Sequence, residues 1–584
     1  MSVITRSVEP SRLRARSKSA TSEMLGGTLT TYDPRAMRRA EADITAETRL
    51  VLINPEQDSG HAIAKFVPSP YHGTWRMKHF LEGKYGWKVA VIDFNIHAKS
   101  EVMEKLVRYR PPFVGFAFFY DNLPNDLNNL WSIRCALPES FLVAGGIEVT
   151  TRAEEYIAKL PIDGVLKGEG EFALAALMAG AAPEWNAVDK DALIERASSV
   201  PGWLFKTSDG TIVRAPPAHP FNAEQYSEVF ETYSLSAKEY HPYWNFIQEN
   251  YDDDLLDVLD VNPKMIRLIS ANYCPYGCSF CASTKFLNFA SGEKKVKVVG
   301  ASAQQLFDKA ASLLAENPNV FIYIDDENFM ALPERAYEFC SLVKESGLKG
   351  DFGCRGTAQL ITEEICAALC EAGFKVVAFG AESWDDTVLA DFNKRLQNGR
   401  SDVAIRNITS AGMKCSFNVI LVAPTITEPG LIKTCDKIVE YTAMGCNVGM
   451  TTCIVPYPGT KYFQSDDYVR VEGVIAIPGT DETMAFPCAV LPNDPRLRAL
   501  MPSAQEMGTE LLDQWRKTFA WRDALMPREV CGLAFIFAIF CELGIIDEDG
   551  RRDRILAAAS DILGNKRPNF VRAKGLSVAS AALY

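Results

Sequence analysis

The feature that most constrains the fold is an alternation of short apolar runs with amphipathic stretches, which occurs in two separate blocks of the chain. In the first block, five runs rich in Val, Ile, Leu and Phe are separated by stretches with helical periodicity such as 97–109. Apolar strands that alternate with helices are typical of βαβ units. This block therefore predicts an α/β domain with a parallel, doubly wound (Rossmann-like) sheet. The expected strands are 49–55, 87–94, 112–119, 140–150 and 163–171.

The second block contains six βα units in about 195 residues, which is too few for a closed eight-fold barrel. We therefore expect a partial (β/α)6 barrel, with its active groups at the carboxyl ends of the strands. The expected strands are 265–273, 320–326, 349–356, 375–383, 415–424 and 447–457.

These blocks divide the chain into five parts. Residues 1–45 mix Arg with Ser and Pro and lack the apolar core of a signal peptide, which favours a disordered tail over an organelle transit peptide. The doubly wound domain is expected at 46–182 and a linker region with little regular structure at 183–260. The partial barrel follows at 261–484, and a mainly helical, substrate-side domain at 485–584.

Composition excludes several classes of partner. The net charge is −13, from 61 basic and 74 acidic residues, so we expect no nucleic-acid partner. An odd number of cysteines, 15 in all, argues against a disulfide scaffold and favours a reducing compartment, the cytoplasm. The longest apolar stretch, 531–546, contains Glu542 and is shorter than the roughly 20 residues that cross a membrane, so we expect no membrane partner.

Three of the cysteines form one motif, in the sequence ANYCPYGCSFCAST directly after the first strand of the second block. Cys274, Cys278 and Cys281 have the spacing C-x3-C-x2-C, and thiolates this close on a tight loop can converge on one iron–sulfur cluster. Three ligands leave one iron open for a substrate or cofactor. A structural zinc normally takes a fourth Cys or His, and no His follows Tyr273.

With these cysteines, residues 265–460 resemble the radical S-adenosylmethionine (SAM) superfamily, and in particular its cobalamin-binding branch. The motifs that carry the resemblance are CSFCASTKF, IDDENF (324–329), AGFKVVAFGAES (372–383) and VPYPGTKYF (455–463), in the same order as in the family. The resemblance implies a 4Fe–4S cluster whose open iron chelates SAM. An electron from the cluster would then cleave SAM to a 5′-deoxyadenosyl radical.

Carried over onto this sequence, the resemblance implies that Gly380 and Glu382 lie near SAM and that Arg355 pairs with its carboxylate. The alternatives are a strand-end surface carboxylate for Glu382 and an interdomain salt bridge for Arg355. Asp325 and Asp326 are expected at the mouth of the barrel, one of them in a structural role.

The chain departs from the family pattern at two strand ends. The fifth strand ends in LVAPTITEPG (421–430) instead of a Gly-x-Pro-Gly-Glu-Thr-like turn, and Trp384 stands where a Gly is expected. A further hypothesis is that Glu293 is a fourth ligand of the cluster in place of SAM. The alternative for Glu293 is an ordinary surface turn.

The first block resembles the cobalamin-binding domain of the same branch through AGGIEVT (144–150) and LKGEGE (166–171). Glycines after these strands let the backbone approach a large cofactor at the carboxyl edge of the sheet. The candidate cobalamin-binding residues there are Gly145, Gly146, Gly168, Glu169 and Gly170.

The Asp-x-His-x-x-Gly motif that gives cobalt a histidine ligand is absent, because Asp58 and His61 occur in the wrong order in QDSGHAIAKF. The lower cobalt face is expected to be empty, to hold water, or to be covered by His61, His72 or Arg76. A cation such as Arg76 cannot ligate cobalt and would favour the four-coordinate cob(I)alamin state, which attacks SAM as a nucleophile.

The leading functional prediction is a cobalamin-dependent radical SAM C-methyltransferase of a small molecule, reduced by a partner such as flavodoxin or ferredoxin. Overall size and layout look similar to the tryptophan 2-C-methyltransferases of thiostrepton-type antibiotic biosynthesis, so carbon C2 of tryptophan is the first candidate acceptor. Another natural-product or hopanoid methylase, or a ring cyclase, shares all of these motifs. A non-catalytic cobalamin or redox sensor is the alternative from a different class.

Overall fold

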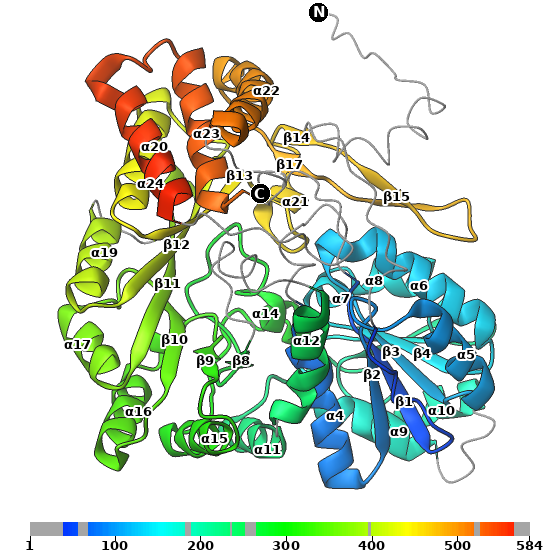
Figure 1. Cartoon of the computed structure of the whole chain (residues 1–584). Helices are drawn as coiled ribbons and strands as arrows, with labels where there is room; N and C mark the ends of the chain where they lie inside the picture. Colours follow the sequence, from blue (N-terminus) through cyan, green and yellow to red (C-terminus); the bar gives the residue numbers. More distant parts are fainter. Residues whose placement is uncertain are drawn as a thin grey trace, which may run out of the picture.

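The computed structural model describes residues 39–56, 68–181, 189–233, 236–250, 264–394, 399–518 and 526–565. Figure 1 shows an N-terminal α/β domain in blue and cyan, a curved sheet with helices in green and yellow, and a helical C-terminal part in orange and red. The prediction of an α/β chain with a doubly wound domain, a six-stranded partial barrel and a helical end is confirmed.

Five parallel strands form the main part of the N-terminal sheet, in the order β2-β1-β3-β4-β5. Their residues are almost all buried because helices cover both faces of the sheet. The strands are β1 (Thr48–Ile53), β2 (Lys88–Ile92), β3 (Phe113–Ala117), β4 (Phe141–Gly145) and β5 (Gly164–Leu166). The helices are α4 (His72–Tyr85), α5 (Lys99–Tyr109), α6 (Leu123–Ala136), α7 (Ile147–Thr151), α8 (Ala153–Lys159) and α9 (Glu171–Gly180).

Two stretches on either side of this domain differ from expectation. Of the expected tail, residues 1–38 lie outside the described residues, but Ala42 and Ile44 are buried in the domain core. The expected linker contains α10 (Lys190–Ala197), β6 (Trp203–Lys206), β7 (Ile212–Arg214), α11 (Ala223–Thr232) and α12 (Ala237–Asn250). β6 and β7 extend the sheet in antiparallel fashion, because Trp203 and Phe205 bury their rings in the core.

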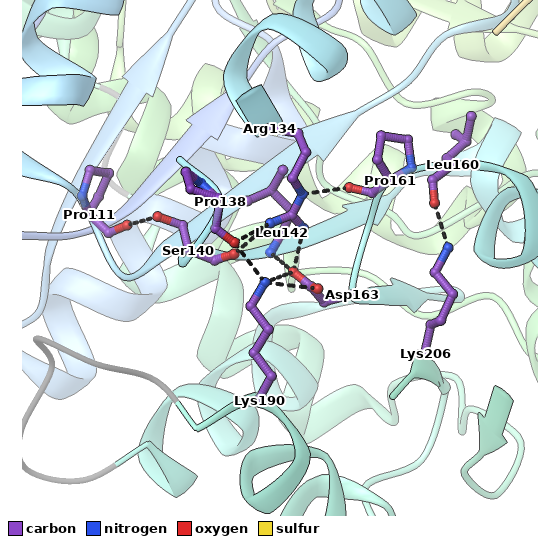
Figure 2. Close-up of polar contacts among 10 residues, drawn as sticks. All are labelled: Pro111, Arg134, Pro138, Ser140, Leu142, Leu160, Pro161, Asp163, Lys190 and Lys206. Carbon is purple, nitrogen blue, oxygen red and sulfur yellow. Dashed lines mark hydrogen bonds and ion pairs between the residues drawn. The ribbon is translucent and has the colours of Figure 1, made fainter. Parts of the chain in front are cut away.

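The amino end of this sheet is closed by polar contacts around Asp163 (Figure 2). Asp163 accepts hydrogen bonds from Arg134 Nη2 at 2.6 Å, from the Leu142 amide at 2.7 Å and from Lys190 Nζ at 3.2 Å. Lys206 donates to the Leu160 carbonyl at 2.7 Å. Because these polar groups are hydrogen-bonded to one another, we expect ligands at the opposite, carboxyl edge of the sheet.

The second sheet has six parallel strands in the order β13-β12-β11-β10-β9-β8 and does not close. The strands are β8 (Met265–Leu268), β9 (Phe321–Ile324), β10 (Asp351–Gly356), β11 (Phe374–Glu382), β12 (Lys414–Val422) and β13 (Asn447–Cys453). The helices are α14 (Phe286–Ser291), α15 (Ala303–Glu316), α16 (Pro333–Ser346), α17 (Glu363–Glu371), α18 (Asp386–Asp391), α19 (Arg400–Ser410) and α20 (Glu428–Ala443).

After the barrel, an arm of short strands reaches back over the N-terminal domain (Figure 1). Ile477 and Met484 of this arm are buried in the N-terminal core, and Gly479 lies against the ring of Trp131. The arm comprises α21 (Lys461–Gln464), β14 (Arg470–Val471), β15 (Val474–Ala476), β16 (Thr483–Ala485) and β17 (Ala489–Val490). The chain continues with α22 (Pro495–Thr518), α23 (Arg528–Glu542) and α24 (Arg551–Asn565). Among the described residues, none of the helices combines the length and apolar character that crossing a membrane requires.

The carboxyl edges of the two sheets lie against each other, since α14 of the barrel packs on α7. Tyr457, after the sixth barrel strand, donates a hydrogen bond to Asp121 of the N-terminal domain at 2.9 Å. A Cβ added to Gly168 would come within 2.9 Å of Ala290 in α14. The positions expected to bind cobalamin and those expected to bind the cluster are therefore close together.

Candidate functional site

A buried carboxylate fixes the start of the cysteine loop. Asp326, which is 1% exposed, accepts hydrogen bonds from the Ala271 amide at 3.0 Å and from the Ser270 hydroxyl at 2.8 Å. Arg335 pairs with the same carboxylate at 2.8 Å and donates to the Ser270 carbonyl at 2.7 Å. Of the two aspartates in IDDENF, Asp326 thus holds the loop in position.

The end of α18 holds the cysteine loop on both sides of Cys278. The Ser279 amide donates to the Phe392 carbonyl at 2.9 Å, and Asn393 Nδ2 donates to the Gly277 carbonyl at 3.1 Å. The rings of Phe280 and Phe392 pack with centroids 4.9 Å apart. The loop therefore has a defined conformation from protein contacts alone.

The three cysteines lie on this loop, with Cys274 buried and the other two half-buried. Burial raises the pKa of all three thiols, that of Cys274 to about 12, so iron would have to displace their protons. Among the described residues, no three His, Cys, Asp or Glu side chains gather closely enough to hold a single metal ion. Three thiolates on one loop are the protein ligands that an iron–sulfur cluster takes, with each thiolate on a different iron.

Glu382 and Lys394 form a buried ion pair beside this loop. Their side chains are 8% and 9% exposed, and Lys394 Nζ lies 2.6 Å from Glu382 Oε1. Glu382 has φ +63° at an irregularity in the β11–β12 pairing, and its carboxylate folds back over Gly380. A Cβ at Gly380 would lie 1.8 Å from Glu382 Oε1 and 2.7 Å from Lys394 Nζ, so any larger residue there would displace the ion pair. Burial lowers the pKa of Lys394, but the charge and hydrogen bond of Glu382, together with Cys278 and Cys281, raise it by more, so the pKa is raised overall.

Arg355 lies near the end of β10 and pairs with Asp325 at 2.8 Å. Arg267 of β8 lies 3.8 Å from the same carboxylate, and both arginine side chains are about four-tenths exposed, 39% for Arg267 and 43% for Arg355. The charge of Glu327 also acts on Arg355, so the two arginines face two carboxylates, and the partly exposed Arg355 still has N–H donors to offer. These donors suit a carboxylate ligand.

Glu293, the hypothetical fourth ligand, lies in an exposed turn. Glu293 is exposed in the turn after α14, where its amide donates to Ser291. The carboxylate that raises the pKa of Cys274 and Cys281, after burial, belongs to Glu327 in IDDENF. The exposed turn agrees with the alternative for Glu293, an ordinary surface turn, and the fourth-ligand hypothesis stays a prediction.

The two departures from the family pattern are connected through Asp385, the residue after Trp384. Trp384 is 5% exposed, its amide donates to Thr434 at 3.0 Å, and its indole nitrogen donates to Asp402 at 3.0 Å. The neighbouring Asp385 accepts from the Thr427 amide at 2.9 Å, in the unusual turn after β12. The tryptophan and the altered turn therefore form one structural unit.

The glycine turns of the N-terminal domain lie at the carboxyl edge of β4 and β5, as expected. Gly146 and Gly168 have φ +104° and +81°, a conformation that glycine adopts readily. The Gly168 amide donates to Thr150 Oγ1 at 3.0 Å, which joins the two turns. Gly145 is half-buried, and Gly170 precedes α9.

Charged side chains surround these turns. Arg76 of α4 contacts Glu171 at 2.5 Å. Burial lowers the pKa of Arg76, but Glu171, Tyr226 and Glu169 together raise it by more, so the pKa is raised overall. Burial raises the pKa of Glu169 to about 7. Glu169 Oε1 and Glu171 Oε2 are buried without a hydrogen-bond partner in the described part of the chain. Orphaned polar atoms beside glycine turns fit a large amide-bearing cofactor such as cobalamin.

The histidine expected near cobalt is also placed. His72 lies one turn before Arg76, and its Nδ1 is 2.6 Å from the Tyr233 hydroxyl. Burial, and then the charges of Arg267, Arg76 and Arg355, lower its pKa to about 3, so it is neutral at pH 7. His61 lies outside the described residues.

Two family models match the chain in these regions. The B12 binding domain matches residues 73–178, and the radical SAM superfamily matches residues 268–438. The chain combines a B12 binding domain with a radical SAM domain. The expected cofactors, a 4Fe–4S cluster, SAM and cobalamin, are confirmed as those of the two domains.

Known proteins with a related sequence have diverse activities. An anaerobic magnesium-protoporphyrin IX monomethyl ester cyclase of Cereibacter sphaeroides is 25% identical to this chain. The match covers 71% of this chain and 63% of the cyclase. An uncharacterized methyltransferase of Pyrococcus horikoshii is 23% identical over 56% of the chain and 62% of the relative.

Two solved structures share the fold. TsrM from Kitasatospora setae, a radical SAM methyltransferase solved with cobalamin and a [4Fe–4S] cluster, has a TM-score of 0.57 at 15% identity, over 88% of this chain and 99% of that one. The cobalamin-dependent radical SAM enzyme OxsB has a TM-score of 0.56 at 14% identity, over 91% of this chain and 77% of that one.

Sequence reasoning missed three side chains of this site. Lys394 follows α18 without any motif of its own, Arg335 lies in the first turn of α16, and Glu327 was passed over inside IDDENF. Only Glu327 carried a signal, because a third acidic residue directly after a barrel strand lies at the mouth.

Proposed function

We propose that this protein is a cobalamin-dependent radical SAM C-methyltransferase acting on a small molecule. One observation carries the proposal: the cysteine loop and the glycine turns belong to two domains whose carboxyl edges pack together through α14 and α7. Cofactors bound at these two places would lie within reach of one substrate. When bound, cobalamin supplies a nucleophilic cobalt that carries methyl groups, and the cluster supplies single electrons.

The chain's own residues prepare these sites. Cys274, Cys278 and Cys281 would hold the cluster, on a loop that Asp326 and Asn393 keep in place. Gly145, Gly146, Gly168 and Gly170 would let the backbone approach cobalamin, and Glu169 would accept hydrogen bonds from its amides. The cation that the sequence suggests under cobalt, Arg76, keeps its charge through Glu171 and cannot act as a ligand.

The SAM site that we propose lies between the cluster loop and Arg355. Arg355 is partly exposed, and its guanidinium can take a carboxylate in addition to Asp325. Glu382 would act through Lys394, which occupies its carboxylate, and Gly380 leaves room for that pair. SAM would therefore contact Lys394 on this side of the site.

For the acceptor, we propose carbon C2 of tryptophan. The support is the fold shared with TsrM, which has been solved with tryptophan and a SAM analogue, over 89% of that chain. A second candidate is ring closure on a large substrate, favoured by two anaerobic cyclases among the relatives, at 25% and 22% identity.

A product assay separates the candidates. The reconstituted protein is incubated anaerobically with cobalamin, a reductant, methyl-labelled SAM and L-tryptophan, and the products are analysed by mass spectrometry. Label in 2-methyltryptophan is expected, and none without cobalamin. Turnover of magnesium-protoporphyrin IX monomethyl ester instead would favour the cyclase. No turnover of SAM with any acceptor, despite bound cofactors, would favour the sensor.

A further inference from the structure

A short segment wraps the outer side of the cysteine loop. After α14, the chain runs antiparallel to the start of the loop: the Asn272 amide donates to the Val299 carbonyl at 3.0 Å, and Ala271 pairs with Gly300. The Tyr273 hydroxyl donates to the Val296 carbonyl. The strip 296–300 therefore lies directly beside the start of the loop, next to Cys274.

This segment concentrates positive charge. Lys285, Lys294, Lys295 and Lys297, called the lysine patch below, occur within 13 residues, and Glu293 is the one carboxylate among them. The last three lysines are exposed, and none of the four forms an ion pair with a described residue. The whole chain, in contrast, has a net charge of −13.

The backbone beneath the patch is held firmly. Val296 is 8% exposed and packs with Tyr273 and Leu287 in a small core of its own. Because side chains alternate along an extended strip, burying Val296 directs Lys295 and Lys297 to solvent. Fixed cations on a rigid strip are suited to steering a partner of opposite charge.

The patch also reaches the cluster ligands. Lys285 directly follows the cysteine loop, where its amide donates to the Ala282 carbonyl at 3.1 Å. The strip that carries Lys297 pairs with Ala271 and Asn272, just before Cys274. A protein seated on the patch would therefore have a short path to the cluster.

We propose that the lysine patch docks a small acidic electron carrier, of the flavodoxin or ferredoxin type, that reduces the cluster. The carrier's reduced flavin or iron–sulfur centre loses one electron, and the cluster gains it. The inference rests on the radical SAM domain and its need for electrons, and it holds whichever acceptor is methylated.

The test uses the reconstituted full chain and a flavodoxin, kept reduced by its reductase and NADPH. The triple charge reversal Lys294→Glu, Lys295→Glu, Lys297→Glu is compared with the natural chain. A second triple reversal at exposed lysines of other elements, Lys238, Lys349 and Lys433, changes the net charge equally. Stopped-flow bleaching of the cluster's visible absorbance gives the reduction rate, and calorimetry gives the flavodoxin Kd.

We expect the patch variant to be reduced at least about tenfold more slowly by flavodoxin and to bind it about tenfold more weakly at low salt. The control triple should stay within about twofold, and dithionite should reduce all three proteins equally. Equal rates with flavodoxin would overturn the proposal. A matching loss with dithionite would also overturn it, because the lysines would then act on the cluster itself. If the triple variant holds less iron, the single variants Lys295→Glu and Lys297→Glu decide by the same comparison.

Discussion

The ion pair between Glu382 and Lys394 offers a quantitative test of how the site is built. Replacing Lys394 by Met leaves the Glu382 carboxylate, 8% exposed and 2.6 Å from the missing ammonium, without its partner. Breaking a buried pair from one side costs about 3–5 kcal/mol. Changing both residues, Lys394→Met with Glu382→Gln, removes the stranded charge, so we expect a coupling energy of about 1–3 kcal/mol.

The assay is urea unfolding of the apo protein, followed by tryptophan fluorescence, because the buried Trp384 lies two residues from Glu382. The matched control is Lys375→Met, which breaks an ion pair with Asp351 in the same sheet. That pair is 3.7 Å long with both side chains about six-tenths exposed, 59% and 62%, so its loss should cost less than about 1 kcal/mol. The reasoning is refuted if the Lys394 variant loses no more than the control, or if the two single losses add without coupling.

Three further predictions concern neighbouring parts of the site. Asp326→Asn should lower the iron content after reconstitution, because the loop loses the charge that binds Arg335, while cobalt binding is retained; metal analysis measures both. Gly168→Ala should loosen the domain interface and speed limited proteolysis, because the added Cβ would approach Ala290 at 2.9 Å. The control is Gly210→Ala, since Gly210 has a similar φ, +86°, and a Cβ there would meet no atom within 4 Å. Equal rates of proteolysis for the two variants would contradict the prediction. The pKa of Glu169 is raised to about 7 in the folded protein, above its pKa in the unfolded chain. Protonated Glu169 therefore stabilises the fold at pH values below the unfolded pKa, and this stabilisation is lost as the pH rises through 7. The urea midpoint of Glu169→Gln should therefore rise relative to that of the natural chain between pH 5 and 8. A difference in midpoint that stays constant with pH would exclude this.

The fold could be predicted in large part because apolar runs report burial on both faces of a parallel sheet. The strands ending at Gly145 and Leu166 are of this kind, and both sheets follow from such runs. β6 and β7 were hidden because the short runs around Trp203 and Ile212 lie between proline-rich stretches that favour loops. Their place in the sheet depends on tertiary packing of Trp203, which no local pattern contains.

The site was predictable where chemistry requires a motif and not where it requires a partner. The spacing of Cys274, Cys278 and Cys281 follows from sharing one loop, and the glycine turns follow from close approach to a ligand. Lys394 and Arg335 act through contacts across the barrel, with Glu382 at 2.6 Å and Asp326 at 2.8 Å. Contacts between residues far apart in the sequence produce no periodic pattern in it, so they could not be predicted from the sequence.

The most direct test of the central claim, that one chain holds an iron–sulfur cluster and cobalamin at facing edges, is metal analysis after anaerobic reconstitution with iron, sulfide and cobalamin. We predict about four iron atoms and one cobalt per chain. Replacing Cys274, Cys278 or Cys281 by Ala should abolish the iron and leave the cobalt bound. Iron retained in these variants, or cobalt never retained by the natural chain, would contradict the account.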